Sequence, residues 1–179
     1  MKLFLFDIMK EIIGDTKCQF IGEIGTHHGG TAYQLVSHLA PRVKHLTYHG
    51  YDVFDLVKDD REFAVKERNS KGAGSLYRAN LTFKKAIKRY GNISYKLFEG
   101  FTTDTLTKPV TYDFVYIDGG HSHETVKHDY SMVKDSKIIV FDDFKIAGVN
   151  KFVKELMEQG VDIEIVKTPT KHVWAVIRN

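Results

Sequence analysis

The pattern of apolar and polar positions first changes period within residues 18–39. Phe20, Ile21 and Ile24 form a short apolar run, which is typical of a buried strand. Glycines within and after this run are followed by residues 31–39, where the apolar positions recur at helical spacing. This stretch therefore predicts a strand, a glycine-rich loop and a helix.

The rest of the chain repeats this alternation. Further apolar runs predict strands over residues 44–53, 93–98, 114–117, 137–144, 161–167 and 172–177. Helical spacing predicts further helices near residues 1–13, 60–68, 75–90, 124–133 and 149–159. The short connection around Pro169 predicts that the last two strands form an antiparallel hairpin. We therefore expect a single α/β domain over residues 1–179, with a doubly wound sheet of seven strands whose last strand is antiparallel.

Two segments stand apart from the regular alternation. Residues 1–17 begin apolar but include Asp7, Lys10 and Glu11, so we expect an N-terminal amphipathic helix packed on the sheet. They are too short and too charged for a membrane span, and they lack a signal-peptide cleavage pattern. Residues 54–74 are polar and end in a glycine-rich stretch, which a lid and a plain connection explain equally well.

Composition indicates an ordinary globular protein in a reducing compartment. The net charge is +3, and the basic residues are not concentrated in one block, so we expect no nucleic-acid partner. The single cysteine, Cys18, excludes an internal disulfide and a Cys-x-x-Cys metal site. We expect a cytoplasmic protein with no membrane association.

The loop after the first strand predicts a ligand site. Its backbone N–H groups and the following helix N-terminus favour a negatively charged group. The spacing of its glycines does not fit the G-x-G-x-x-G pattern of dinucleotide sites, and Glu23 would repel a pyrophosphate but attract an ammonium group. S-adenosylmethionine (SAM) carries an ammonium, a carboxylate and a sulfonium, so it suits this loop better than NAD does. A loop that binds no cofactor is the alternative.

The ends of the second and third strands add candidate cofactor contacts. Asp52 ends the second strand, where a carboxylate can accept hydrogen bonds from both ribose hydroxyls. A surface aspartate is the other interpretation. Gly100 and Phe101 follow the third strand and can hold a flat adenine ring, although a core position explains Phe101 equally well.

Three carboxylates end the fourth and fifth strands: Asp118, and the pair Asp142 and Asp143. Like charges gathered this closely are costly unless a cation neutralises them. Oxygen ligands suit Mg²⁺, with Mn²⁺ and Ca²⁺ as alternatives. In the other interpretation, the aspartate pair caps the next segment and Asp118 contacts only the cofactor.

His121, three residues after Asp118, is the candidate base. Histidine titrates near neutral pH, so it can accept the proton of a hydroxyl group held by a metal. His123 and His128 lie nearby as rivals. A zinc site formed by His121 and His123 would lack further clear ligands.

In this order, the motifs resemble those of the class I SAM-dependent methyltransferases over residues 18–177. The resemblance is greatest to small Mg²⁺-dependent O-methyltransferases, which include the catechol-type and the macrolide-sugar enzymes. Residues 23–29 (Glu-Ile-Gly-Thr-His-His-Gly) are similar to the family's E-x-G-x-x-x-G loop. Residues 118–121 (Asp-Gly-Gly-His) are similar to the D-G-x-H of the sugar-modifying members, and residues 142–144 (Asp-Asp-Phe) to their D-D-[FY] pair.

The resemblance implies a Rossmann-like fold and a set of site residues. The implied cofactor residues are Glu23, Gly25, Thr26, His27, Gly29, Gly30, Thr31, Asp52, Gly100, Phe101 and Asp118. The implied ligands of Mg²⁺ or another divalent cation are Asp118, Asp142 and Asp143, and the implied base is His121.

These observations predict a SAM-dependent O-methyltransferase that acts on a hydroxyl of a small molecule or a sugar. A catechol acceptor is not implied, because catechol-type members carry a lysine where His121 stands. Only residues 1–17 precede the first strand, so we expect the acceptor pocket to be open, or to be closed by residues 54–74 or by a second copy in a homodimer. The alternative from a different class is a SAM-binding module without transferase activity.

Overall fold

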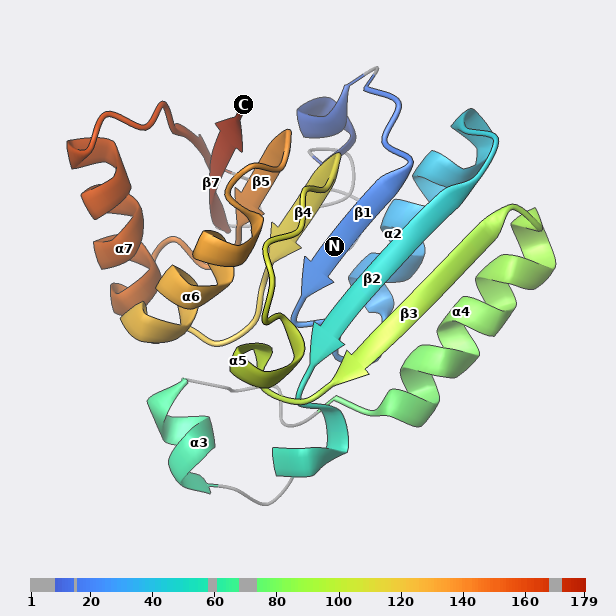
Figure 1. Ribbon diagram of the computed structural model, residues 1–179, viewed down its shortest axis with the longest axis horizontal. Helices are drawn as coiled ribbons and strands as arrows, with labels where there is room; N and C mark the ends of the chain where they lie inside the picture. The colour runs from blue at the N-terminus through green and yellow to red at the C-terminus, as the bar shows by residue number, and fades with distance from the viewer. Residues whose placement is uncertain (1–8, 15, 58–60, 68–73, 168–171) are drawn as a thin grey trace.

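The computed structural model describes residues 9–14, 16–57, 61–67, 74–167 and 172–179 (Figure 1). The described strands are β1 (Phe20–Ile24), β2 (Leu46–Asp52), β3 (Ile93–Glu99), β4 (Phe114–Ile117), β5 (Ile138–Phe141), β6 (Glu164–Lys167) and β7 (Val173–Arg178). The α-helices include α2 (Gly30–Leu39), α3 (Arg61–Lys66), α4 (Leu76–Tyr90), α5 (Thr102–Thr105), α6 (His123–Val133) and α7 (Ala147–Glu158). Two 3-10 helices are η1 (Ala40–Arg42) and η2 (Phe54–Val57).

The strands form one sheet in the order β3-β2-β1-β4-β5-β7-β6. The pairs from β3 to β5 are parallel, whereas β7 runs antiparallel to both β5 and β6. This topology confirms the expected single-domain α/β architecture, with a doubly wound, seven-stranded sheet whose last strand is antiparallel.

The register aligns the carboxyl ends of the central strands. Ile24 of β1 lies opposite Tyr51 of β2 on one side and Ile117 of β4 on the other. Ile117 in turn lies opposite Phe141 of β5. The loops that follow these strands therefore begin at one edge of the sheet, where ligands bind in folds of this type.

Helices cover both faces of the sheet. The helices α2 and α4 lie on one face, and α6 and α7 lie on the other (Figure 1). The core on the first face contains Leu35, Tyr48 and Phe83, and the core on the second contains Phe141 and Phe152. Burial of these apolar side chains is the main stabilising contribution to the fold. The short helix α3 lies beyond the arrowheads of the parallel strands, on the side of the candidate site (Figure 1).

Sequence signals located both ends of α4, whereas the Ser122 cap of α6 was not predicted. Gly91 ends α4 in a left-handed conformation with φ of 75°, and Ser75 is its N-cap, although the Ser75 side chain makes no capping hydrogen bond. Ser122 is the N-cap of α6, and its hydroxyl oxygen accepts a hydrogen bond from the backbone N–H of Thr125 at 3.3 Å. A serine at a helix start can accept a hydrogen bond from an otherwise unpaired backbone N–H group. A glycine at a helix end adopts the left-handed conformation that ends the helix.

Some expectations were incomplete. Residues 9–13 are helical, and the remainder of the predicted N-terminal helix, residues 1–8, lies outside the described residues. The glycine-rich end of the 54–74 segment, residues 68–73, also lies outside them. The sequence did not predict α5, η1 or η2, which are too short to show a periodic pattern. No helix in the described part of the chain has the length and apolar character needed to cross a membrane.

Candidate active site

Backbone hydrogen bonds tie the loops at the carboxyl edge to one another. The N–H of Gly25 donates to the carbonyl of Tyr51 at 2.8 Å, and the N–H of Asp118 donates to that of Ile24 at 2.8 Å. In the same way, Gly100 donates to Asp52 at 3.0 Å and Asp142 donates to Ile117 at 2.9 Å. Each loop thus begins at a fixed place beside its neighbour, so the predicted site residues share one edge.

The glycine loop follows a path that few side chains allow. Gly25 has a φ of 94°, and a Cβ atom there would lie 2.0 Å from the carbonyl oxygen of Asp118. Gly29, with a φ of 77°, precedes α2. A Cβ atom at Gly30 would meet no atom within 4 Å, so the start of α2 borders open space. Backbone N–H groups at this helix start are suited to the negative group of a ligand.

Glu23 and Thr26 lie below the surface of the loop. Glu23 is 1% exposed, and its Oε2 accepts a short hydrogen bond from the phenol of Tyr48. The Thr26 hydroxyl lies 3.4 Å from the same phenol oxygen. Burial first, and the Glu23 carboxylate next, raise the pKa of Tyr48 well above its usual value. Tyr48 of the core therefore holds the Glu23 carboxylate from one side. The expected contact of Glu23 with an ammonium group stays a prediction.

Asp52 joins the glycine loop to the end of β2. Its Oδ2 accepts from the backbone N–H of His27 at 2.8 Å, and its Oδ1 accepts from that of Phe54 at 2.6 Å. Burial raises the pKa of Asp52, and these two hydrogen bonds oppose that effect only in part. Asp52 is therefore an ordered part of the loop rather than an isolated surface aspartate.

The end of β3 presents an exposed aromatic ring. Gly100 has a φ of 142°, in the region that favours glycine, and Phe101 follows it with 42% of its surface exposed. The interpretation of Phe101 as a core residue is therefore wrong. Its predicted contact with adenine stays a prediction.

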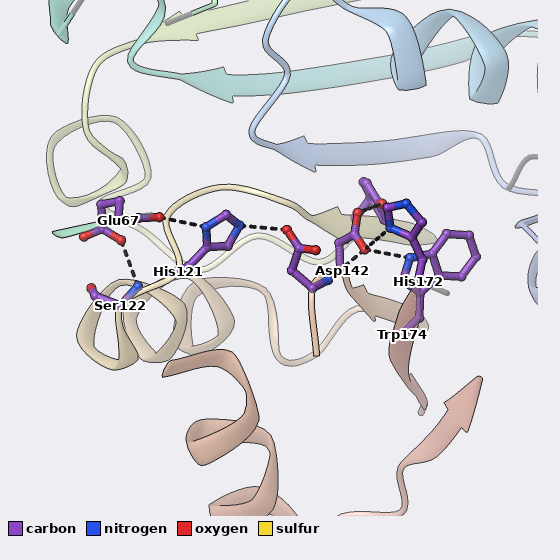
Figure 2. A network of polar contacts seen from close by, with 8 residues as sticks. Glu67, His121, Ser122, Asp142, His172 and Trp174 are labelled. Carbon is purple, nitrogen blue, oxygen red and sulfur yellow. Dashed lines mark hydrogen bonds and ion pairs between the residues drawn. The ribbon is translucent and has the colours of Figure 1, made fainter. Parts of the chain in front are cut away.

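Asp142 is held by three hydrogen-bond donors. Its Oδ2 accepts from the phenol of Tyr116 at 2.6 Å, and its Oδ1 accepts from the indole N–H of Trp174 at 2.8 Å and the backbone N–H of Asp143 at 2.7 Å. His172 Nδ1 lies 3.8 Å from the same Oδ1, as Figure 2 shows. Since Asp142 is only 6% exposed, its carboxylate is largely buried.

Asp118, His121 and Asp143 come together. One potential ligand atom from each lies within 4.8 Å of the other two. His121 Nε2 lies 3.2 Å from Asp143 Oδ2. Two of the three predicted metal ligands thus lie beside the predicted base, whereas the third, Asp142, directs its carboxylate to Tyr116 and Trp174.

His121 is oriented from its other ring nitrogen. Nδ1 lies 2.7 Å from the main-chain carbonyl oxygen of Glu67 (Figure 2). A carbonyl only accepts hydrogen bonds, so Nδ1 carries a proton in both the neutral and the charged ring, and the Asp143 carboxylate beside Nε2 favours the charged ring. Burial alone would lower the pKa of His121, but the hydrogen bonds to Asp143 and to the Glu67 carbonyl raise it above its usual value.

The rival histidines make other contacts. His123 Nε2 lies 2.8 Å from Glu155 Oε2, which joins α6 to α7. His128 does not belong to either candidate ligand cluster of the described residues. His27 and His28 stack on each other in the glycine loop, with ring centroids 3.9 Å apart.

Sequence reasoning missed Glu67, Tyr116 and Trp174. A tyrosine in a fully buried strand is a usable signal, because its hydroxyl needs a buried partner. Nothing in the local pattern marks Glu67, which lies 54 positions from the histidine that it contacts.

Comparison with known proteins adds a family match. The model of a family described as "Methyltransferase domain" matches residues 23–144, about two thirds of the chain. The matched region begins at Glu23 and ends at Phe144, so it contains every predicted cofactor and metal residue. No curated protein matches the chain in sequence.

Several solved structures have the same fold. Precorrin-6y C5,15-methyltransferase from Geobacter metallireducens GS-15 is 16% identical, with a TM-score of 0.62 over 98% of this chain and 87% of that one. The O-methyltransferase TomG from Streptomyces achromogenes, solved in complex with SAM, is 15% identical, with a TM-score of 0.57 over 99% and 79%. An O-methyltransferase family protein from Burkholderia thailandensis is 11% identical, with a TM-score of 0.60 over 98% and 55%.

Proposed function

Since the chain belongs to the family of methyltransferase domains whose model it matches, we propose that it transfers the methyl group of SAM to a hydroxyl of a small molecule or a sugar. The orientation of His121 is the observation that supports transfer to an oxygen atom. Its Nδ1 proton is held by a carbonyl, so Nε2 is directed toward Asp143 at the strand ends. A histidine in this arrangement suits the removal of a hydroxyl proton.

The carboxyl edge of the sheet fits SAM. Gly29 and Gly30 lead into the open start of α2, which suits the carboxylate of the methionine part. Asp52 is fixed at the end of β2, where it suits the ribose, and Phe101 is exposed at the end of β3, after the half-buried Gly100, where it suits the adenine. When bound, SAM supplies an electrophilic methyl group, and the chain's own residues align the acceptor and remove its proton.

His121 is the proposed base. The Glu67 carbonyl holds one ring nitrogen of His121, which leaves the other, Nε2, as the nitrogen that can accept a proton. Its Nε2 would take the hydroxyl proton while Nδ1 remains bonded to the Glu67 carbonyl.

A divalent cation is part of the proposal. The Asp118 and Asp143 carboxylates fit a hard cation such as Mg²⁺, which often binds through two carboxylates and water. Asp142 belongs to a second group of potential ligand atoms, with Asp143 and His172, and it already accepts three hydrogen bonds, so its part as a third ligand is proposed with these bonds in place. When bound, the cation would lower the pKa of an acceptor hydroxyl.

The acceptor itself is proposed only as a class. We propose that residues 54–74 contribute to its pocket, because Glu67 lies against the loop that carries His121. In the alternative, a second copy of the chain covers the acceptor pocket. Light scattering with and without ligands tests whether the chain forms a dimer.

Calorimetric titration with SAM is the first test, with NAD as the control cofactor. We expect micromolar binding of SAM and none of NAD, followed by methylated product with a panel of hydroxylated acceptors. Turnover should fall when EDTA removes divalent cations and recover with Mg²⁺ or Mn²⁺. SAM binding without product from any acceptor would instead favour a SAM-binding module.

His121→Ala tests the base. We expect SAM affinity near the wild-type value and turnover lowered by about 10²-fold or more, the usual contribution of a general base. His123→Ala is the matched control, because His123 pairs with Glu155 instead. Loss of SAM binding in His121→Ala would show that this histidine belongs to the cofactor pocket.

A further inference from the structure

Glu67 is buried although its surroundings are exposed. It follows α3 and is 4% exposed, whereas Val65, two residues earlier, is 78% exposed. A carboxylate is seldom this buried unless partners compensate for its lost hydration. The contacts of Glu67 should therefore account for its burial.

The Glu67 carboxylate binds the first turn of α6. Its Oε2 accepts from the backbone N–H of Ser122 at 2.8 Å, and its Oε1 accepts from the hydroxyl of Thr125 at 3.0 Å. The positive end of the helix dipole also favours a carboxylate there. These contacts join the end of α3 to the start of α6, and Figure 2 shows the one between Glu67 and Ser122.

Gly120 leaves the space that Glu67 occupies. A Cβ atom at Gly120 would lie 2.6 Å from Glu67 Oε2 and 2.7 Å from the Cγ2 atom of Thr125. The backbone of Gly120 does not have a positive φ, so the need for glycine here is one of space. The second glycine of the Asp-Gly-Gly-His loop thus accommodates a side chain from a distant segment.

The main chain of Glu67 completes the arrangement, since its carbonyl oxygen accepts from His121 Nδ1 at 2.7 Å. We propose that Glu67 is a positioning residue: its carboxylate anchors the carbonyl that keeps a proton on His121 Nδ1 and leaves Nε2 as the proton acceptor. The proposal rests on the proposed function, in which His121 is the base. It assigns a role to a residue outside the sequence motifs of the site.

Glu67→Ala is the main variant, and Glu158→Ala is the control, because Glu158 is an exposed glutamate at the end of α7, outside the proposed site. Nitrogen-15 NMR of the imidazole rings at alkaline pH reports the tautomer, and His121→Gln identifies the His121 signals. In Glu67→Ala we expect the Nε2–H tautomer to appear and kcat to fall about tenfold to hundredfold, with the Kd for SAM within a factor of about two. Glu158→Ala should match the wild type in all three.

Glu67→Gln tests rescue by a side chain of the same shape. Its amide oxygen can accept from Ser122, and the Thr125 hydroxyl can turn to accept from the amide. We expect the Nδ1–H tautomer and most of kcat to be retained. If Glu67→Ala does not fold, Gly120→Ala should displace the carboxylate and shift the tautomer in the same direction.

Three results would overturn the proposal: an unchanged tautomer in Glu67→Ala, an unchanged kcat in that variant, or a loss of SAM binding equal to the loss of kcat. The tautomer is measured without turnover, so it tests the role of Glu67 separately from the proposed function. A shifted tautomer in a protein that methylates nothing would contradict the proposed function while supporting the role of Glu67 in orienting His121.

Discussion

At Gly25 the backbone of the glycine loop passes so close to the loop after β4 that a methyl group does not fit. A Cβ atom would lie 2.0 Å from the Asp118 carbonyl oxygen, and the φ of 94° would strain any other residue. Gly30 is different, because a Cβ atom there meets nothing within 4 Å. Two glycines of one motif therefore answer to different physical demands.

Gly25→Ala should destabilise the protein by at least about 3 kcal/mol, since backbone strain and a steric clash combine. Gly30→Ala, at the first position of α2, should change stability by less than about 1 kcal/mol. Thermal or urea unfolding of both variants measures the difference. Equal stability of the two variants would mean that the loops can move apart without cost.

Asp129 is a buried carboxyl in α6 that the proposed chemistry does not use. Burial, with a smaller contribution from nearby Glu67, raises its pKa to about 7. In the unfolded chain an aspartate loses its proton near pH 4. Between these values the folded state holds a proton that the unfolded state has released, so the stability contribution of Asp129 falls as the pH rises.

Asp129→Asn should therefore gain stability relative to the wild type as the pH rises from about 4 to about 7, by up to about 4 kcal/mol. The difference should be small below pH 4 and constant above pH 8. Urea unfolding across this range measures it, and Asp104→Asn, which alters an exposed aspartate, is the control. A constant difference over the whole range would contradict the raised pKa.

Three strands meet at one carboxylate. Asp142 follows β5 and accepts hydrogen bonds from Tyr116 of β4 and Trp174 of β7. Both donors are buried, so each would be left without its partner if the carboxylate were removed. Asp143, the next residue, directs its carboxylate toward His121 instead. Asp142 thus joins strands of the sheet, whereas Asp143 lies beside His121 in the candidate site.

Asp142→Ala should lower the free energy of unfolding by about 2–4 kcal/mol, because it leaves two buried donors unpaired. Asp143→Ala should cost less than about 1 kcal/mol but lower turnover and the response to Mg²⁺. Chemical unfolding and metal-dependent turnover of both variants separate the two roles. Similar unfolding curves of the two variants would mean that Asp142, like Asp143, belongs to the candidate site and does not stabilise the sheet.

The whole molecule shows where sequence patterns succeed. The apolar run at residues 114–117 predicted β4 with its observed ends, and Gly91 marked the end of α4. These features depend on neighbouring residues, through burial on both faces or through a backbone conformation. The order of the strand-end motifs likewise predicted which side chains would share an edge.

Contacts between distant segments could not be predicted in this way. Glu67 reaches Ser122, 55 positions away, and Trp174 reaches Asp142, 32 positions away. No local pattern carries such pairings, because they exist only once the sheet has formed. The sequence therefore indicated which carboxylates gather at the site, but not which of them would be buried in the core.

Ligand binding should be visible in the stability of the entire protein. SAM at about 100 times its Kd adds about 2.7 kcal/mol to the free energy of unfolding, which raises the unfolding temperature by roughly 5–10 °C in a protein of this size. NAD at the same concentration should leave it unchanged. Differential scanning calorimetry measures both, and an equal shift with NAD would contradict the choice of cofactor.

The place of β7 between β5 and β6 has a consequence for the protein during its synthesis. A chain leaves the ribosome from its N-terminus, and β7 is the last described strand to emerge. Until then β5 is an open edge, and open edges invite pairing with other chains. The Trp174 indole that completes the Asp142 network arrives with the same strand. A nascent chain therefore covers the β5 edge and completes the hydrogen bonds to Asp142 in one late event.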